Sequence, residues 1–317
     1  MLSTIPALDD IVNACNRIDT MIHKTPVLRS GFINELSNCQ LYFKCENFQK
    51  VGAFKFRGAA NAVLQLTDEI KANGVATHSS GNHAQALALA ARIHQLKAYI
   101  VMPENAPAVK RNAVRDYGAE IIMCKPTLAA REEMLNRVTK ETGAVFIHPY
   151  NNYDIICGQA TCAYELLDEI GNLDAVVAPV GGGGLLSGTC LSAHYLNPEI
   201  EVFGAEPAGA ADAYHSLEKD EIVPSVNPVT IADGLLTSLG DKTFPVIRDH
   251  VQGIILTGER EIIHAMRLIW ERMKIIIEPS AAVALAAVLR EKEYFKDRRV
   301  GIILSGGNVD LAHLPFD

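Results

Sequence analysis

The most informative feature of the sequence is a run of four glycines: Gly181, Gly182, Gly183 and Gly184. The run follows an apolar segment at 175–180 and precedes a helix that we expect to begin near Leu185. Because ordering four glycines costs backbone entropy, the run indicates a backbone that another group approaches closely. Amides at a helix N-terminus bind anions, so strand, glycine run and helix together predict a phosphate-binding loop, with a plain tight turn as the alternative.

A dinucleotide is the competing ligand for this loop. Glu206 ends the next expected strand, about twenty residues on, where a ribose-binding acid would lie. The letters GGGGLLSG, however, do not complete the dinucleotide pattern G-x-G-x-x-G in any register. The sequence also lacks the G-x-x-x-x-G-K-[ST] pattern of nucleotide triphosphate loops.

A second candidate is Lys55, which lies between apolar residues in the segment VGAFKFRGA at what looks like a helix start. Desolvation and the positive end of a helix both disfavour an ammonium ion there. Both effects lower the pKa of the amine and favour the neutral form that a Schiff base requires. On spacing alone, a lysine that extends to solvent remains the alternative.

Two further segments place polar groups beside expected strand ends. The segment THSSGNH at 77–83 brings Ser and Asn side chains to the start of a helix, which suits a carboxylate or a ring hydroxyl, although a plain Ser N-cap is the alternative. Ser305-Gly306-Gly307-Asn308 follows another buried strand. Ligands of open α/β sheets bind beyond the carboxyl ends of the strands, where both segments and the glycine run lie.

The elements that position these residues alternate between short β-branched runs and longer amphipathic stretches. Parallel strands need helical crossovers, so this alternation predicts an α/β fold with doubly wound parallel sheets. We expect one unit at 71–149 and a larger discontinuous domain at 1–70 and 150–317, with the early strand 41–45 pairing into the larger unit. The expected strands are 75–78, 98–102, 120–123, 145–148, 175–180, 202–206, 254–257 and 300–304, and the expected helices are 82–95, 108–117, 128–142, 185–194, 259–273 and 281–291.

Composition excludes several functional classes. The chain of 317 residues carries a net charge of −8 with its basic residues dispersed among acids, so we expect no nucleic-acid partner. Its apolar runs are far shorter than the roughly 20 residues of a membrane span, and the N-terminus does not have the pattern of a secretory signal. Seven cysteines without C-x-x-C spacing predict reduced thiols and a cytoplasmic protein.

Five segments together resemble a known family: KCENFQKVGAFKFRGA, SSGNHAQAL, PVGGGGLLSG, IIIEPSAA around Glu278, and LSGGNVDL. They are similar to the motifs of fold-type-II pyridoxal 5'-phosphate (PLP) enzymes, specifically of serine racemases and serine/threonine dehydratases. The similarity runs from about Thr25 to Leu311 in the family's order. It implies a fold of the tryptophan-synthase-β type, with the active site in the cleft between two domains. One departure is Gly158-Gln159-Ala160, where the family pattern has G-Q-G.

The resemblance implies a role for each cofactor-site residue. Lys55 would form the Schiff base with PLP, and the four glycines would hold its phosphate. Asn82 would bond the ring hydroxyl, and Ser305 would bond the pyridine nitrogen. Because the Ser305 hydroxyl is neutral, the ring would be a weaker electron sink, which suits β-elimination. Phe54 and Glu278 would complete the site.

The same resemblance implies two catalytic residues, Lys55 and Ser80, on opposite faces of the substrate carbanion. Serine racemases have serine at the position of Ser80, where threonine dehydratases usually have alanine. Elimination of the β-hydroxyl and inversion at Cα would then share one carbanion. The residues implied in substrate binding are Ser79, Ser80, Asn82, His83, Arg131 and Ser238. Arg131, if it does not belong to a solvated helix face, could bind a second carboxylate and admit 3-hydroxyaspartate.

The resemblance further implies a divalent cation and an effector. Glu206, the Ala210 carbonyl and Asp212 are similar to the cation site of the racemase branch, and all-oxygen ligands suit Mg²⁺, Ca²⁺ or Mn²⁺. ATP would bind at the subunit interface of a homodimer through Tyr117, Arg272, Lys274 and Asn308. The alternatives to a serine-acting enzyme are a threo-3-hydroxyaspartate dehydratase and a PLP-binding homologue without turnover.

Overall fold

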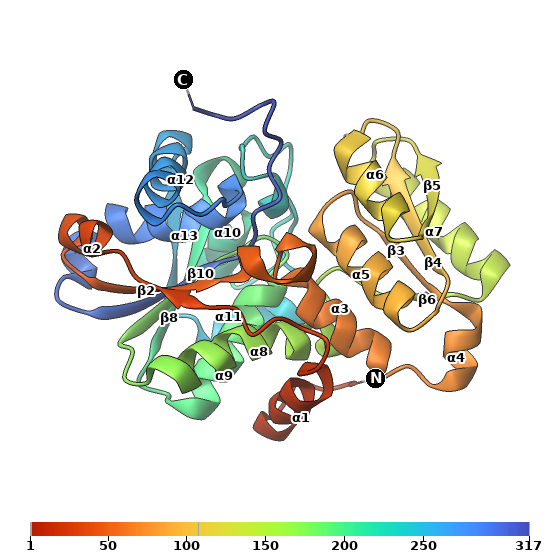
Figure 1. Cartoon of the computed structure of the whole chain (residues 1–317), viewed down its shortest axis with the longest axis horizontal. Coiled ribbons are helices and arrows are strands. Elements are labelled where there is room, and N and C mark those ends of the chain that lie inside the picture. Colours follow the sequence, from red (N-terminus) through yellow and green to blue (C-terminus); the bar gives the residue numbers. More distant parts are fainter. Residues whose placement is uncertain (1, 107, 317) are drawn as a thin grey trace.

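The computed structural model describes residues 2–106 and 108–316 and contains two sheets of mainly parallel strands (Figure 1). The larger sheet has the strand order β1-β2-β10-β7-β8-β9, and the smaller has the order β5-β4-β3-β6. Only β1 runs antiparallel to its neighbour among these strands. The α/β fold with parallel sheets is therefore confirmed. The strands are β1 (Val27–Leu28), β2 (Gln40–Cys45), β3 (Val75–His78), β4 (Ala98–Pro103), β5 (Glu120–Cys124), β6 (Val145–Phe146), β7 (Ala175–Pro179), β8 (Glu201–Pro207), β9 (Gly253–Thr257) and β10 (Arg299–Leu304).

The early strand β2 lies beside the last strand of the chain. Its residues pair in parallel with β10 from Gln40 opposite Arg299 to Cys45 opposite Leu304. This pairing agrees with the expectation that the segment 41–45 joins the later α/β unit. It brings the chain that leads to Lys55 to the carboxyl ends of β10 and β7.

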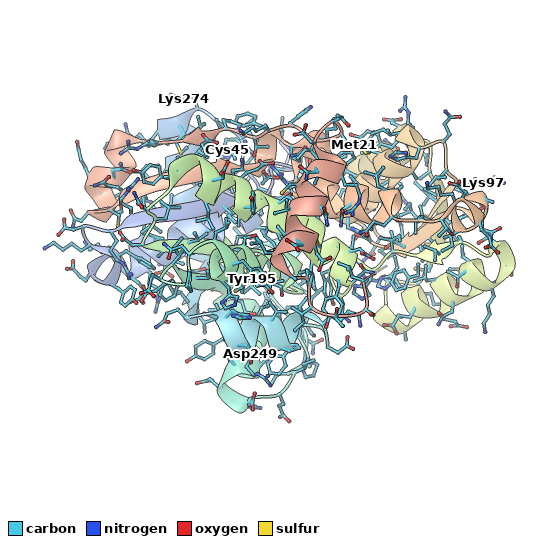
Figure 2. The ribbon with its side chains drawn as sticks, turned by 90° about the horizontal axis from the view of Figure 1, so that it is seen from below. Met21, Cys45, Lys97, Tyr195, Asp249 and Lys274 are labelled. Atoms are coloured by element: carbon cyan, nitrogen blue, oxygen red, sulfur yellow. The ribbon has the colours of Figure 1, made fainter. Side chains whose placement is uncertain are left out.

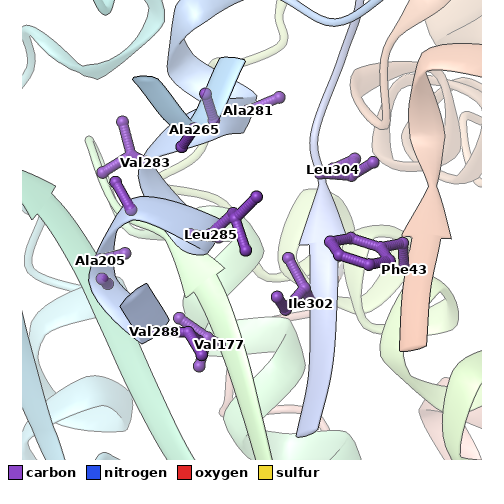
Figure 3. Packing of buried hydrophobic residues seen from close by; sticks show 14 of the residues in the cluster. Phe43, Val177, Ala205, Ala265, Ala281, Val283, Leu285, Val288, Ile302 and Leu304 are labelled. Atoms are coloured by element: carbon purple, nitrogen blue, oxygen red, sulfur yellow. The ribbon is translucent and has the colours of Figure 1, made fainter. Parts of the chain in front are cut away.

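Helices cover both faces of the larger sheet. One face carries a core formed with α2, α12 and α13, in which Phe43, Val177 and Ile302 from three strands pack toward Leu285 and Val288 of α13 (Figure 3). The other face packs against α1, α8, α9 and α11. The helices on the two faces are α1 (Leu8–Ile18), α2 (Gly31–Ser37), α8 (Tyr153–Ile170), α9 (Gly184–Leu196), α10 (Asp212–Lys219), α11 (Thr243–His250), α12 (Glu259–Met273), α13 (Pro279–Arg290) and α14 (Lys292–Phe295).

One helix packs against both halves of the molecule. Helix α3 (Lys55–Leu64) contacts α5 of the smaller sheet and α8 of the larger, and Phe56 and Val63 lie in the core beneath the smaller sheet. We propose domains at 1–70 plus 150–317 and at 71–149, with α3 as the packing element between them. The remaining helices are α4 (Asp68–Asn73), α5 (Asn82–Ile93), α6 (Ala108–Asp116) and α7 (Leu128–Thr142). The 3-10 turns are η1 (Glu46–Phe48) and η2 (Lys50–Gly52) between β2 and α3, η3 (Ala208–Ala210) between β8 and α10, and η4 (Asp233–Leu235) between α10 and α11.

Close helix packing explains the departure from the G-Q-G pattern. A Cβ on Gly158 of α8 would lie 2.6 Å from the Cα of Gly58 on α3, so the two helices approach at glycine on both sides. Ala160 faces α9 at Gly188, where an added Cβ would lie 2.6 Å from the Ala160 nitrogen. The alanine is therefore accommodated by a glycine on the neighbouring helix.

The side chains of the surface are mixed in charge. Figure 2 places Lys97 at the end of the molecule formed by the smaller sheet and Lys274 on the side of the larger sheet, with Asp249 and Tyr195 on the helices between them. Within residues 2–106 and 108–316, none of the helices combines the length and the apolar character that a membrane crossing requires.

Candidate active site

Lys55 is the first residue of α3 and lies beside the turn after β10. Ala53 and Gly306 form an isolated antiparallel bridge, and the Phe54 N–H donates to the Ser305 carbonyl at 3.0 Å. The segment that carries the lysine is therefore hydrogen-bonded to the Ser305 turn, and the structure brings together two motifs that lie 250 residues apart.

The Lys55 amine lies in an environment that favours its neutral form. Burial lowers the pKa of the amine to about 8, and the negative charge of Glu278 partly opposes this shift. Its Nζ donates to the Pro149 carbonyl at 2.9 Å, and it lies 5.1 Å from the centre of the Phe54 ring. With this pKa about a tenth of the amine is neutral at pH 7, against fewer than about one in a thousand for an ordinary lysine.

A polar network links the smaller sheet to the larger one next to Lys55. The Asn82 amide donates to both oxygens of Glu278 at 2.9 and 3.1 Å, and the Asn308 amide donates to Asn82 Oδ1 at 2.9 Å. Burial raises the pKa of Glu278 to about 7; the charge of Asp233 adds to this rise and the hydrogen bond from Asn82 opposes it.

The glycine run forms the turn between β7 and α9. Gly183, at φ +86°, is the N-cap of α9, and no side chain caps this helix. The amides at its first turn are therefore left for an anion. The Tyr150 ring packs closely against the loop, because a Cβ on Gly182 would lie 2.4 Å from this ring.

A second uncapped helix begins at the end of β3. The N-cap of α5 is Gly81, and no side chain caps the helix, so the N-cap alternative for Ser79 and Ser80 is not what the structure has. Ser79 Oγ instead accepts the Gly81 N–H at 3.3 Å. Both serines are half-buried at this helix N-terminus, beside Asn82.

The other implied substrate residues lie in different surroundings. His83 is buried on α5, its Nε2 lies 3.2 Å from the Ile147 carbonyl, and its Nδ1 is buried without a partner. Arg131 on α7 has a buried Nε with no partner among the residues that the structure describes, and its charge contributes to lowering the pKa of His78 after the larger effect of burial. Ser238, in the segment between α10 and α11, accepts the Ser225 N–H at 2.7 Å.

Sequence reasoning missed the cluster of rings after β6. His148 packs edge-on against Tyr150 with ring centres 4.6 Å apart, and Phe146 lies 5.4 Å from His148. The carbonyl that accepts the hydrogen bond from Lys55 Nζ belongs to Pro149, which lies between His148 and Tyr150 in the chain. The letters HPY, which begin with the last residue of the strand expected at 145–148, were the available signal, because they stand at a strand's carboxyl end.

A family model described as "Pyridoxal-phosphate dependent enzyme" matches residues 18–306. The chain belongs to this family. The match confirms the family that the five sequence motifs indicate, and it covers both sheets and every motif apart from the end of LSGGNVDL.

Relatives of this PLP-dependent enzyme match over nearly their whole length. A "Serine racemase" of Dictyostelium discoideum is 53% identical over 97% of this chain and 96% of its own. A "beta-hydroxyaspartate dehydratase" of Paracoccus denitrificans is 49% identical over 99% of both chains. The crystal structure of the Dictyostelium serine racemase superposes with a TM-score of 0.93, covering 96% of this chain and 99% of the other.

The described residues fit the family's cofactor. An uncapped helix N-terminus suits its phosphate, and a lysine with a pKa of about 8 suits its aldehyde. The Ser305 side chain, almost fully buried, lies on the same turn as the backbone that binds Phe54. These groups come from β7, α3 and β10, whose ends meet on one side of the larger sheet.

The residues implied in cation binding lie together after β8. Glu206 is almost fully buried and accepts the N–H groups of Ala213 and Tyr214 at 2.8 and 2.9 Å. The Asp212 side chain is also almost fully buried. Burial raises the pKa of Glu206 to about 8 and that of Asp212 to about 6. The charge of Asp212 adds to the rise at Glu206, so the two buried carboxylates lie close to each other, as ligands of one cation would.

The residues implied in nucleotide binding lie on different elements of one chain. Arg272 and Lys274 are at the end of α12, and the Arg272 guanidinium lies 4.0 Å from the Phe32 ring centre. Tyr117 follows α6 and packs against the core of the smaller sheet. Asn308 donates to Asn82 and to the Val51 carbonyl, so its amide belongs to the network beside Lys55.

Proposed function

We propose that this enzyme removes the Cα proton of a small hydroxy amino acid, L-serine, L-threonine or 3-hydroxyaspartate, with PLP on Lys55. Loss of the β-hydroxyl as water leaves an aminoacrylate, which water hydrolyses to a 2-oxo acid and ammonia, whereas return of a proton to the other face racemises serine. The observation that carries the proposal is the Lys55 amine, with its lowered pKa of about 8, beside two uncapped helix N-termini.

When bound, the cofactor ring withdraws electron density from the substrate Cα and so makes its proton removable. The chain's own residues hold the reacting groups. The amides of Gly181 to Gly184 bind the phosphate, Asn82 bonds the ring hydroxyl, and Phe54 and Glu278 line the ring. Ser305 bonds the ring nitrogen with a neutral hydroxyl. This pairing supports elimination, in which the leaving hydroxyl takes up the electrons.

Two residues serve the two faces of the substrate. Lys55 accepts the Cα proton on one face, and its lowered pKa makes the free amine a competent base near neutral pH. Ser80, half-buried at the start of α5, exchanges a proton on the other face. Elimination needs Lys55, whereas inversion needs both.

The substrate carboxylate is bound by Ser79, Asn82 and His83 at the α5 N-terminus, where amides and helix dipole favour an anion. Ser238 contributes from the loop of the larger sheet. A second carboxylate would be bound by Arg131, and its buried, unpartnered Nε supports this role over a solvated helix face. This observation favours 3-hydroxyaspartate as a further substrate.

The test measures products from purified enzyme with PLP, Mg²⁺ and each of the three substrates. Pyruvate and D-serine are followed together from L-serine. We expect Lys55→Ala to abolish both products, Ser80→Ala to remove D-serine selectively, and Lys140→Ala, on the exposed end of α7, to leave both unchanged. Arg131→Leu should lower turnover of 3-hydroxyaspartate but not of serine. The absence of turnover on all three substrates, with PLP bound, would leave a non-catalytic homologue.

A divalent cation is the second part of the proposal. Glu206, Asp212 and the Ala210 carbonyl supply only oxygen ligands, and with two carboxylates the shell needs waters, which suits Mg²⁺, Ca²⁺ or Mn²⁺. The cation braces the larger sheet near the glycine loop and takes no part in the chemistry. Loss of cation binding in Asp212→Asn, measured by calorimetry, tests the assignment.

We also propose a cytoplasmic homodimer with ATP as effector. Exposed apolar side chains gather near the end of α12: Phe32 and Leu36 lie on α2, and Ile276 follows the helix. This patch supports a subunit interface, where Tyr117, Arg272, Lys274 and Asn308 from two chains would meet ATP. Sedimentation of the enzyme and of Phe32→Asp tests the interface, because a charge there should yield monomers. All seven cysteines are free, in keeping with a reducing compartment.

A further inference from the structure

The Pro149 carbonyl offers the unmodified Lys55 amine a fixed place. Nζ donates to it at 2.9 Å, and the pair links α3 to the turn that follows β6. An amine that has given up its bond to the cofactor in favour of the substrate amine is again unmodified, and in that state it must act as the base. Its position then decides the rate of proton removal.

The turn that presents this carbonyl is held by the side chains of His148 and Asn151. Nδ1 of His148 accepts two backbone N–H groups, from Tyr150 at 3.2 Å and from Asn151 at 2.9 Å. The Asn151 side chain ties the same turn to the larger sheet's loop, where it donates to Asp241 at 2.6 Å and accepts the Lys242 N–H at 2.8 Å. The turn is thus fixed from both sides.

The His148 ring can accept hydrogen bonds and does not change its protonation state near neutral pH. Burial lowers its pKa to about 4, the charges of His78, Lys55 and Lys242 add to the shift, and Asp241 opposes it. At neutral pH the ring is therefore neutral, its Nδ1 lone pair faces the two N–H groups, and its proton is on Nε2. A ring that stays neutral keeps its Nδ1 lone pair available to both N–H groups and so holds the turn in place.

We propose that His148 is a positioning residue, which holds the Pro149 carbonyl against the Lys55 amine and so keeps the released amine aimed at the substrate Cα. The inference rests on the proposed function for its role in turnover, but the contact itself does not depend on the substrate. Misplacing a catalytic group by about 1 Å can cost on the order of 100-fold in rate. A turn that no longer holds the Pro149 carbonyl in place should therefore lower kcat.

Three substitutions isolate the acceptor. His148→Asn puts an amide oxygen where Nδ1 lies, His148→Gln carries it farther out, and His148→Phe keeps the ring without an acceptor. Asparagine and glutamine both carry a side-chain amide and differ only in its reach. Comparing these two variants therefore tests the position of the acceptor even when the Phe variant does not fold. Urea titration of each variant establishes that it is folded.

The first measurement needs no cofactor or substrate. Lys55 of the cofactor-free protein is labelled with an amine-reactive reagent across pH, and the labelled peptide is quantified by mass spectrometry. We expect the Asn variant to match the wild type, and the Gln and Phe variants to react several-fold faster with a shifted midpoint, because their amine is no longer held. Equal labelling in the Asn and Gln variants would overturn the proposal.

The second measurement uses the holoenzyme and Cα-deuterated serine. We expect the Gln and Phe variants to lose about 10- to 100-fold in kcat, with a larger isotope effect and KM within about threefold, and the Asn variant to recover most of kcat. Equal losses in Asn and Gln would also refute the positioning role. A wild type without turnover would refute the proposed function, and the labelling experiment would still decide the contact.

Discussion

Substituting Arg57 with methionine tests the buried charges that fix α3 behind Lys55. The guanidinium is fully buried and donates to both oxygens of Glu46, at 2.8 and 2.9 Å, and of Glu165, at 2.7 and 2.8 Å. Lys44, also buried, donates to Glu165 at 2.8 Å. Methionine fills a similar volume but leaves both carboxylates without their main partner.

The size of the loss follows from the burial of the partners. Removing one member of a buried ion pair costs about 3–5 kcal/mol because it leaves an uncompensated charge. The Glu46 side chain is 0% exposed and that of Glu165 is 17% exposed, and Glu165 keeps Lys44. Most of the loss therefore arises at Glu46, and we expect about 4 kcal/mol in the free energy of unfolding at pH 8.

The loss should depend on pH in a defined direction. Burial acts to raise the pKa of Glu165, but the hydrogen bonds and charge of Arg57 and the charge of Lys44 outweigh it and lower the pKa. A carboxylate with a lowered pKa stabilises the fold above its unfolded value, and this stability is lost as pH falls through the folded pKa. The difference between wild type and variant should therefore be smaller at pH 4, below the ordinary pKa of a glutamate, than at pH 8.

Urea titrations at both pH values measure the effect. Arg137→Met is the control, because its pair with Glu141 is exposed on α7 and should contribute far less. Adding Glu46→Gln to Arg57→Met should recover part of the loss by removing the stranded charge. A loss below about 1 kcal/mol at pH 8, or a loss that grows at pH 4, would refute the reasoning.

Three further predictions concern the site. Gly182→Ala should weaken PLP binding about tenfold or more in a fluorescence titration, because its Cβ would lie 2.4 Å from the Tyr150 ring. Mg²⁺ should raise the melting temperature more at pH 8 than at pH 6. The pKa of Glu206 is raised to about 8, so the fold loses stability as pH rises and this carboxyl ionises, and a bound cation would offset the new charge. Glu206→Gln should remove this pH dependence. Asp233→Asn, which breaks the ion pair with Lys110, should lower D-serine formation more than pyruvate formation.

Each of these has a result that contradicts it. Unchanged PLP affinity in Gly182→Ala would mean that the Tyr150 ring moves freely. Equal Mg²⁺ effects at the two pH values would place the cation away from Glu206. A uniform fall in both products of Asp233→Asn would mean that the contact supports the whole fold rather than one face of the site.

Local patterns in the sequence were sufficient for much of the fold. The strands around the glycine run, the helix start at Lys55 and the pairing of β2 with the later sheet agree with expectation, since each depends on a short apolar run beside glycine or polar residues. Helix α8 was missed. It is buried over most of its length, so apolar and small residues occur on every side of it and no amphipathic period marks it.

Contacts between distant segments lay beyond such patterns. Asn308 matched a nucleotide position, yet its amide bonds Asn82 and the Val51 carbonyl, because the turn after β10 folds back over the start of α3. The hydrogen bonds of His148 are local, but their consequence is that Pro149 meets Lys55, 94 residues earlier. The packing of α3 between the sheets brings these two distant segments together, and no local pattern in the sequence shows it.

The division of the site between two sheets explains why Asp233→Asn should separate the two products. Lys55 is fixed to the larger sheet, because Arg57 on the same helix is bonded to Glu46 and Glu165 and the preceding residues are bonded to the turn after β10. Ser80 begins a helix of the smaller sheet, whose position relative to the phosphate loop depends on polar contacts such as Lys110 with Asp233 and Asn82 with Glu278. If Ser80 serves only inversion, as we propose, weakening one of these contacts should displace it and leave elimination on the Lys55 face intact.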